Sequence, residues 1–265
     1  MLGVVISLLL SAGVQVWTEP SLVQVMEASS KSAFAKKDIH LYAARGEHES
    51  IQVCVRAEKQ AIADLRLEGE GLSGGIQAPR IARVGYLHIT TPSPRATGPG
   101  PFWPDVLVDA APIHLNPGES AVYWVTYRVP PETKPGTHKG SVRVFSGIRC
   151  LKRVPVRLKV FDFALPGVPS LPVWFAWNPT GLDDPLNAWK SAFDVLAGYR
   201  ISFGGPKLTL PGLNDAYAST LPAMACISVD GTAPRESIRA QTEELAGKGS
   251  LPRACVPMVI PDART

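Results

Sequence analysis

Adjacent acidic side chains are the first candidates for chemistry in this chain, because two carboxylates can share the work of a general acid and a general base. Only two such pairs occur, Asp183-Asp184 and Glu243-Glu244. The first pair precedes Pro185, a pattern typical of a helix amino terminus, where carboxylates cap free N–H groups. The second pair falls in the middle of a predicted helix, so we expect it to face solvent. Neither pair predicts a catalytic centre.

Motifs for other chemistries are missing from the sequence. It contains no G-x-S-x-G of a serine hydrolase, no P-loop and no G-x-G-x-x-G. The four cysteines are too far apart to form C-x₂-C, so we expect no metal site and no cofactor. Each cysteine lies in an apolar stretch, which favours small core residues over disulfides. They are Cys54, Cys150, Cys226 and Cys255.

The elements that would position any site fall into two patterns, of which the first is that of an antiparallel β-sandwich. Short alternating runs are separated by clusters of Gly, Pro, Asn and Ser. One face of residues 121–129 is far more apolar than the other and is expected to cover a core. Residues 91–117 contain seven prolines and are predicted to form an ordered loop, not a strand. The predicted strands are residues 17–26, 39–43, 50–57, 63–68, 81–90, 121–129, 140–145 and 151–161.

After a proline-spaced linker, the hydrophobic period changes from two toward 3.6. Strands are predicted over residues 173–178, 223–229 and 254–260, and helices over residues 185–199 and 234–248. Strand alternating with helix is typical of parallel βα units. The 99 residues from 167 to 265 are too few for a (β/α)₈ barrel, which needs about 250 residues. We therefore expect an incomplete (β/α)₈-type barrel.

The predicted organisation is a signal peptide in residues 1–13, a β-sandwich domain in residues 14–166 and a partial barrel-like domain in residues 167–265. The run from Leu2 to Ala12 is uncharged and apolar, has about the length of a signal-peptide core, and is too short to span a bilayer. A buried first strand is the alternative. Export would make the protein secreted, periplasmic or attached to the cell surface.

Composition limits the partners. The chain is 45% hydrophobic and 19% charged, as expected of a folded protein. Its net charge of +4 is spread thinly, and no predicted helix collects arginines on one face with aromatics between them. We therefore expect no binding to nucleic acid and no membrane span.

The segment Tyr42-Ala-Ala-Arg-Gly-Glu-His-Glu-Ser-Ile-Gln-Val-Cys-Val-Arg56 resembles the "ARGE…E…Q…V" signature of the glycoside hydrolase family 123 and DUF4091 group. Further motifs of that group's amino-terminal β-sandwich follow in the same order, and the likeness covers nearly all of residues 17–175. They are Arg83-Val-Gly-Tyr86, Pro104-Asp105-Val-Leu107, Tyr123-Trp124-Val125, Val129-Pro130, Pro135-Gly136-Thr-His-Lys-Gly140 and Val160-Phe-Asp-Phe-Ala-Leu-Pro166.

The resemblance weakens where the family carries its catalytic residues. It implies substrate-assisted hydrolysis of N-acetylhexosaminides, in which one carboxylate orients the 2-acetamido group and its neighbour protonates the leaving oxygen. The family's Asp-Glu dipeptide is missing from this sequence. Only Asp262 could stand in, and it is followed by Ala263 where the second acid belongs. Asp262 is the candidate catalytic residue.

Four further residues are candidates for substrate binding. Trp177 and Asn178 end the first barrel-like strand, and the carboxyl ends of such strands form the active face of a barrel. An indole ring suits the apolar C–H face of a pyranose, although core packing explains Trp177 equally well. Arg200 belongs to a segment that is similar to another family motif. Asp230 also ends a predicted strand, where an ordinary turn is the alternative.

Three hypotheses about function follow. The first is an exported glycoside-hydrolase-like protein whose gene continues or whose missing acid comes from another chain. The second is a non-catalytic carbohydrate-binding or cell-surface module, in which the sandwich or the Phe102-Trp103 loop binds the partner. Exposed coplanar aromatics on the sandwich would favour it. The third is a truncated product without activity, which would expose an unpaired apolar edge on residues 254–260 and self-associate through it.

Overall fold

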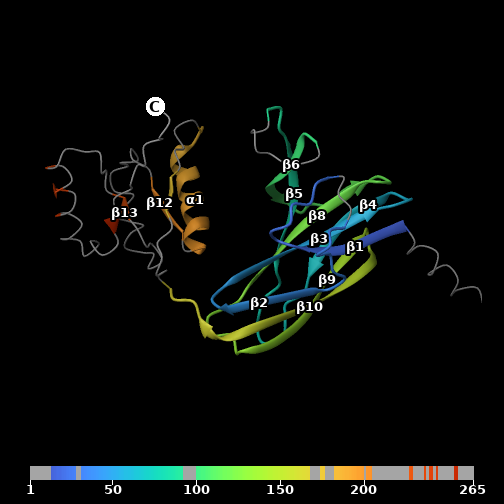
Figure 1. The fold of residues 1–265 in the computed structure, drawn as a ribbon, viewed down its shortest axis with the longest axis horizontal. Coiled ribbons are helices and arrows are strands. Elements are labelled where there is room, and N and C mark those ends of the chain that lie inside the picture. Colours follow the sequence, from blue (N-terminus) through green and yellow to red (C-terminus); the bar gives the residue numbers. More distant parts are fainter. Residues whose placement is uncertain are drawn as a thin grey trace, which may run out of the picture. The chain divides into compact units, whose positions relative to one another are not determined.

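The computed structural model describes residues 13–27, 31–91, 100–167, 174–176, 182–199, 201–204, 227–228, 236, 239–240, 243 and 254–255. The chain divides into two compact units, Met1–Leu165 and Pro166–Thr265 (Figure 1). Both interpretations of residues 1–12, as signal peptide or first strand, lie outside the described residues.

The first unit is built from two five-stranded sheets. Sheet A has the order β1-β3-β8-β5-β6, and sheet B has the order β2-β10-β9-β4-β7. The strands of sheet A are β1 (Val14–Pro20), β3 (His48–Ala57), β5 (Arg80–His88), β6 (Phe102–Asp109) and β8 (Ser120–Arg128). Those of sheet B are β2 (Ile39–Arg45), β4 (Ile62–Gly69), β7 (Ile113–Leu115), β9 (Gly136–Ser146) and β10 (Arg149–Ala164). The predominantly β architecture with two sheets agrees with the prediction.

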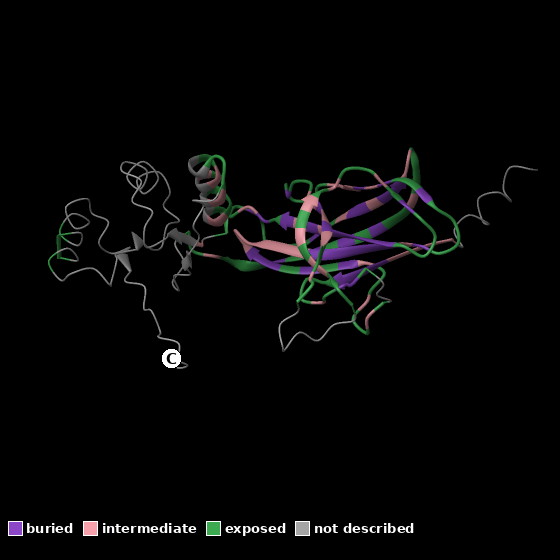
Figure 2. Cartoon of the chain, turned by 90° about the horizontal axis from the view of Figure 1, so that it is seen from above, coloured by how far each residue is buried: buried purple, intermediate pink, exposed green. Residues whose placement is uncertain are grey.

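Alternation along each strand sends one set of side chains into a shared core (Figure 2). On β8, Tyr123, Val125 and Tyr127 are fully buried in this core, as predicted for that face of residues 121–129. On β10 the corresponding residues are Val154, Val156, Leu158 and Val160. The intervening residues of β10 are therefore directed to the outer face of sheet B.

One strand pair departs from the predicted antiparallel pattern. β2 pairs with β10 in parallel, with Ile39 opposite Val156 and Tyr42 opposite Lys159. The ladder is irregular between Val160 and Ala164 of β10. The alternating pattern that predicted each strand carries no information about which distant strand becomes its neighbour, or in which direction.

The proline-rich segment of residues 91–117 was wrongly predicted to lack strands, because it contains β6 and β7. Both strands lie at sheet edges, where one side of the strand has no partner. An edge position tolerates a residue without an N–H, and Pro104 pairs opposite Tyr86 beside a register shift in β5. The first strand was also predicted too far along the chain. It ends at Pro20, after which the Val23 N–H donates to the Pro20 carbonyl in a turn (3.1 Å).

A second, smaller core lies on the outer face of sheet A. Trp17, Cys54 and Val122 are opposite one another on three neighbouring strands and all are buried. The segment between β1 and β2 covers them with Val23, Val25 and Ala35. Cys54 therefore agrees with the prediction of a core cysteine, whereas Cys150 on β10 is exposed and contradicts it.

The second unit begins with a strand, a helix and a parallel strand. These are β11 (Trp174–Ala176), α1 (Pro185–Gly198) and β12 (Ser202–Gly204). Asp184 caps α1, because its Oδ1 accepts from the Asn187 N–H (3.0 Å), which confirms the helix start. A second parallel pair joins β13 (Ile227–Ser228) and β14 (Ala254–Cys255). Glu243 is helical and exposed, as expected of a solvated pair. The described residues of this unit show no (β/α)₈ barrel.

Candidate functional site

The five site residues predicted from the sequence lie outside the described residues. They are Trp177, Asn178, Arg200, Asp230 and Asp262. The roles of these residues stay predictions.

Three exposed aromatic rings gather at the end of β10, next to β2, and we call Tyr42, Phe161 and Phe163 the aromatic strip. Their exposed fractions are 56%, 38% and 55%. The rings of Tyr42 and Phe161 have centroids 6.4 Å apart and planes 22° apart. Those of Phe161 and Phe163 have centroids 5.8 Å apart and planes 12° apart. The strip therefore presents three nearly parallel rings to solvent.

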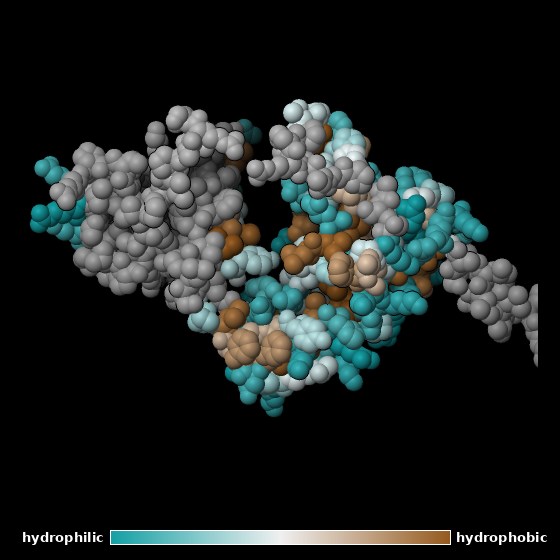
Figure 3. Space-filling model, in the orientation of Figure 1, coloured by the Kyte–Doolittle hydropathy of each residue, from teal (hydrophilic) through white to brown (hydrophobic). Residues whose placement is uncertain are grey.

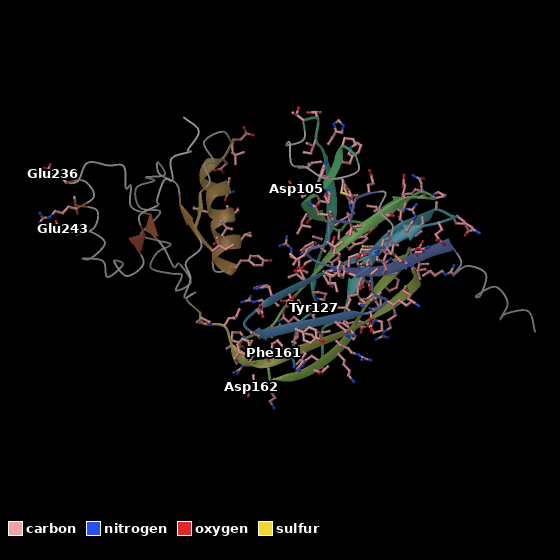
Figure 4. All side chains as sticks on the ribbon, viewed as in Figure 1. Asp105, Tyr127, Phe161, Asp162, Glu236 and Glu243 are labelled. Atoms are coloured by element: carbon pink, nitrogen blue, oxygen red, sulfur yellow. The ribbon has the colours of Figure 1, made fainter. Side chains whose placement is uncertain are left out.

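The local fold explains why these rings face outward. Tyr42 lies between the buried residues Leu41 and Ala43 of β2, so its side chain points away from the core. Phe161 follows the buried Val160, and residues 161–164 are all exposed where the β2–β10 ladder is irregular. Irregularities of this kind redirect side chains at the end of a strand. Figure 4 shows Phe161 and Asp162 at this end of β10, and Figure 3 shows an apolar patch there bordered by hydrophilic residues.

Hydrogen bonds fix the backbone on both sides of the strip. The Leu165 N–H donates to the Arg45 carbonyl (2.9 Å), which ties the end of β10 to the end of β2. The Ala44 N–H donates to Glu47 Oε2 (2.6 Å) within the turn that follows β2. Tyr42 therefore lies on a paired strand, whereas the irregular stretch that carries Phe161 and Phe163 is held by pairing at Val160 and Ala164.

Charged groups border the rings. The Lys159 ammonium lies over the Phe161 ring, 5.7 Å from its centroid, which is a cation–π contact. Arg45 Nη2 lies 3.8 Å from Asp162 Oδ1, and the Asp162 side chain is 85% exposed. Within the described residues, the buried Arg45 Nε has no hydrogen-bond partner. The border thus offers donors and an acceptor beside an apolar surface.

The Phe102-Trp103 segment, the alternative binding site predicted from the sequence, has a different geometry. Phe102 is exposed on the edge strand β6 and contacts His88, with centroids 5.0 Å and planes 45° apart. Trp103 is half-buried. This segment exposes fewer aromatic rings than the strip, and its ring pair is tilted, so it is the weaker candidate for binding a sugar ring.

The described residues limit other kinds of site. No three His, Cys, Asp or Glu side chains among them are close enough to hold a metal ion. No helix in the described part of the chain is sufficiently long and apolar to cross a membrane.

The sequence interpretation named exposed aromatics on the sandwich as a sign of a binding module, but it did not identify these three residues. The signal was present in β10, because Phe161 and Phe163 share the alternation of the outward-facing Arg157 and Lys159. Tyr42 likewise shares the face of His40 on β2. What the sequence could not supply was the parallel pairing that brings Tyr42 beside Phe161.

No protein-family model and no curated protein matches this sequence. Among solved structures, the chain is similar to a family 123 glycoside hydrolase from Clostridium perfringens, studied for glycolipid glycan hydrolysis, with 14% identity and a TM-score of 0.55. That match covers 71% of this chain and 36% of the other, so the chain spans about a third of that structure.

Two other similar structures are the sporulation control protein Spo0M from Bacillus subtilis and a type I cohesin from Pseudobacteroides cellulosolvens. Spo0M matches with 16% identity and a TM-score of 0.26, covering 58% of this chain and 51% of that one. The cohesin matches with 8% identity and a TM-score of 0.23, covering 49% and 91%. Likenesses this weak carry no argument, whereas the first comparison shows that the chain shares its fold with part of a glycoside hydrolase.

Proposed function

We propose that this chain is a glycoside-hydrolase-like protein of the family 123 and DUF4091 group, and that its β-sandwich holds carbohydrate on the aromatic strip. The observation that carries the proposal is the exposure of three nearly parallel rings on a braced strand end. The fold likeness to a family 123 enzyme supports the family assignment. The ordered motifs of residues 17–175 add to that support.

Stacking on pyranose rings is the chemistry that the strip fits best. One face of a pyranose carries axial C–H groups and is apolar, so it can lie on an aromatic face and remove both from water. Because Tyr42 lies on a paired strand and the stretch that carries Phe161 is paired at both ends, at Val160 and Ala164, little conformational entropy is lost when a sugar binds. Arg45 and Lys159 can donate to sugar hydroxyls, and Asp162 can accept from them.

We assign binding, and not hydrolysis, to the β-sandwich. Substrate-assisted hydrolysis needs two carboxylates, whereas the strip has only Asp162, which faces Arg45. Catalysis would belong to a barrel for which residues 167–265 supply the opening units and Asp262 the nearest acid. The parallel pairing of β11 and β12 on either side of α1 supports that part of the proposal.

The proposal also includes export and an unpaired barrel edge. Removal of residues 1–13 as a signal peptide would place the carbohydrate site outside the cell, and the intact mass of the mature natural product tests this. Self-association through residues 254–260 is tested by light scattering of the purified chain at several concentrations.

The test of the binding proposal is affinity electrophoresis and calorimetry of the full chain with N-acetylhexosamine oligosaccharides and with neutral polysaccharides. Tyr42→Ala, Phe161→Ala and Phe163→Ala are each expected to weaken binding by about tenfold, equal to about 1.4 kcal/mol. Phe34→Ala is the matched control, since Phe34 is also an exposed aromatic but lies in the segment between β1 and β2.

Three results would contradict the proposal. Absence of binding to every glycan would remove the carbohydrate function altogether. Equal loss in Phe34→Ala and the strip variants would show that the effect is not local. Loss of binding in Phe102→Ala, with the strip variants unaffected, would move the site to β6.

A further inference from the structure

We propose that the carbohydrate on the aromatic strip is anionic, carrying carboxylate or sulfate groups that bind basic residues beside the strip. This inference rests on the proposed function and names its substrate class. The basic residues are His40, Arg157 and Lys139, which we call the basic row, and Lys159, which joins the row to the strip.

Strand register places the basic row on the outer face of sheet B. Arg157 of β10 is opposite His40 of β2 and opposite Lys139 of β9. Residues directly opposite one another on neighbouring strands share a face. All three are exposed, and the adjacent Val156 and Leu158 are buried in the core. The row therefore crosses three strands on the solvent side.

The basic row is continuous with the aromatic strip. Two residues further along β10 and β2, Lys159 is opposite Tyr42. Neighbouring strands are about 5 Å apart, and a two-residue step is about 7 Å. The row is thus about 10 Å wide and about 7 Å from the line of Tyr42 and Lys159. A ligand of two or three sugars can reach both surfaces.

A second row on the same face shows what a purely structural arrangement of cations looks like. There Arg153 is opposite Arg143, which is opposite Glu68. Glu68 pairs with Arg143 (3.3 Å), and Glu70 pairs with Arg153 (3.2 Å). Facing arginines are thereby compensated by carboxylates on β4 and just after it.

The basic row lacks this compensation. Among the described residues, no carboxylate pairs with Arg157, Lys139 or Lys159, and in the row itself His40 pairs with Asp38 (2.9 Å). Like charges directly opposite on a sheet are destabilising. Three uncompensated cations beside an exposed aromatic surface favour an anionic ligand, because its charge would satisfy them while its rings cover the strip.

The test compares three forms of one polysaccharide bound to the full chain: chondroitin sulfate, desulfated chondroitin, and desulfated chondroitin with its carboxylates reduced to alcohols. Affinity is expected to fall about tenfold with each loss of charge, and the neutral form should still bind through the strip. Raising the salt concentration should weaken binding of the sulfated form and leave the neutral form unchanged.

The variant Arg157→Gln with Lys139→Gln is expected to weaken binding of chondroitin sulfate by about 100-fold, to leave the neutral form unaffected, and to raise the thermal midpoint slightly because repulsion is relieved. Lys59→Gln, an exposed lysine between β3 and β4, is the matched control. The salt series on the unchanged chain keeps the test independent of how the variant folds.

Three other results would contradict the proposal of an anionic ligand. Equal, salt-independent affinity for all three forms would overturn the anionic inference and leave the carbohydrate proposal standing. Absence of binding to all three forms would overturn both. Tighter binding of an oligothymidylate of equal charge would overturn the inference in favour of single-stranded nucleic acid, which also combines stacking with basic residues.

Discussion

The outer faces of the two sheets differ in what covers them, although both carry apolar side chains. On sheet A, Trp17 is only 2% exposed, because the segment between β1 and β2 lies over it. On sheet B, Tyr42 and Phe163 are more than half exposed. An outward-facing aromatic residue is therefore part of a core where a segment covers it and part of a surface where none does.

Specific hydrogen bonds hold the segment between β1 and β2 over the outer face of sheet A. Glu19 is buried and accepts from Trp17 Nε1 (3.0 Å), the Ser32 N–H (2.9 Å) and Ser32 Oγ (2.6 Å). Gln52 Nε2 donates to the carbonyls of Pro20 and Val23 (2.8 and 2.7 Å). Sheet B has no comparable set of bonds among the described residues, and the contrast predicts different responses to substitution.

The largest effect is expected from truncating the covered aromatic. Trp17→Ala should lower the free energy of unfolding by about 3–5 kcal/mol, because it opens a cavity in a packed cluster. Phe163→Ala, on the bare face, should change it by no more than about 0.5 kcal/mol. Urea unfolding followed by far-UV circular dichroism measures both. Similar losses in the two variants would mean that the strip is a second core.

The next largest effect is expected from Glu19, whose carboxylate holds the segment between β1 and β2 in place. Glu19→Ala leaves three donors without their acceptor and should lower the free energy of unfolding by about 3 kcal/mol. Glu19→Gln keeps one carbonyl oxygen for Trp17 and Ser32 and should lose about half as much. Urea unfolding followed by far-UV circular dichroism measures both losses. A loss no larger than that of an exposed carboxylate variant such as Glu58→Ala would contradict the role of Glu19.

These two faces also show how far the sequence could predict the fold. Alternation located eight of the ten strands of the two sheets, all but β1 within a few residues, because one face of each strand must be buried. It missed β6 because Pro104 argues against a strand unless the strand is known to be an edge. Edge position and the parallel β2–β10 pair follow from contacts between distant segments, which a local pattern does not contain.

The candidate site was predictable only in kind. Alternation alone puts Phe161 and Phe163 on the polar face of β10, which marks them as unusual. The same reasoning puts Trp17 and Cys54 on an outer face, where they are buried nevertheless. Whether an outward aromatic is covered depends on how the segment between β1 and β2 folds back, and that depends on Glu19 and Gln52.

Thiol reactivity offers a third test of the covered and bare faces. Cys54 lies beneath the segment between β1 and β2, and burial raises the pKa of its thiol, with the negative charge of Glu19 adding to the effect. Cys150 is exposed on β10. In a chain with Cys226 and Cys255 replaced by serine, Cys150 should react with a disulfide reagent at least about 100-fold faster than Cys54.

Single variants identify the two reactions. Cys150→Ser should abolish the fast phase, Cys54→Ser the slow phase, and urea should make the two rates similar. Equal rates in native buffer would mean that the segment over sheet A opens freely, and the distinction between the faces would fail.

The smallest effects are expected from two carboxylates at opposite ends of β3. Burial raises the pKa of Glu49, with repulsion from Glu47 adding to it. Glu119, next to the far end of β3, has its pKa lowered because it accepts from the Asn116 backbone N–H, with the Asn116 side chain adding to this. The two groups should therefore act on stability with opposite dependence on pH.

For Glu49, the folded chain binds the proton more tightly than the unfolded chain. The contribution of this group to the free energy of unfolding is therefore fully present below pH 4.5 and is lost as pH rises through the raised pKa. Glu49→Gln should stabilise the chain at pH 7 by less than about 1 kcal/mol and lose this gain near pH 4. For Glu119 the stabilisation is present above pH 4.5 and is lost as pH falls through the lowered pKa. Glu119→Gln should therefore be slightly destabilised at pH 7, with the deficit vanishing in acid, as thermal midpoints across this range would show. A parallel response of the two variants would mean that burial of Glu49 is compensated in solution.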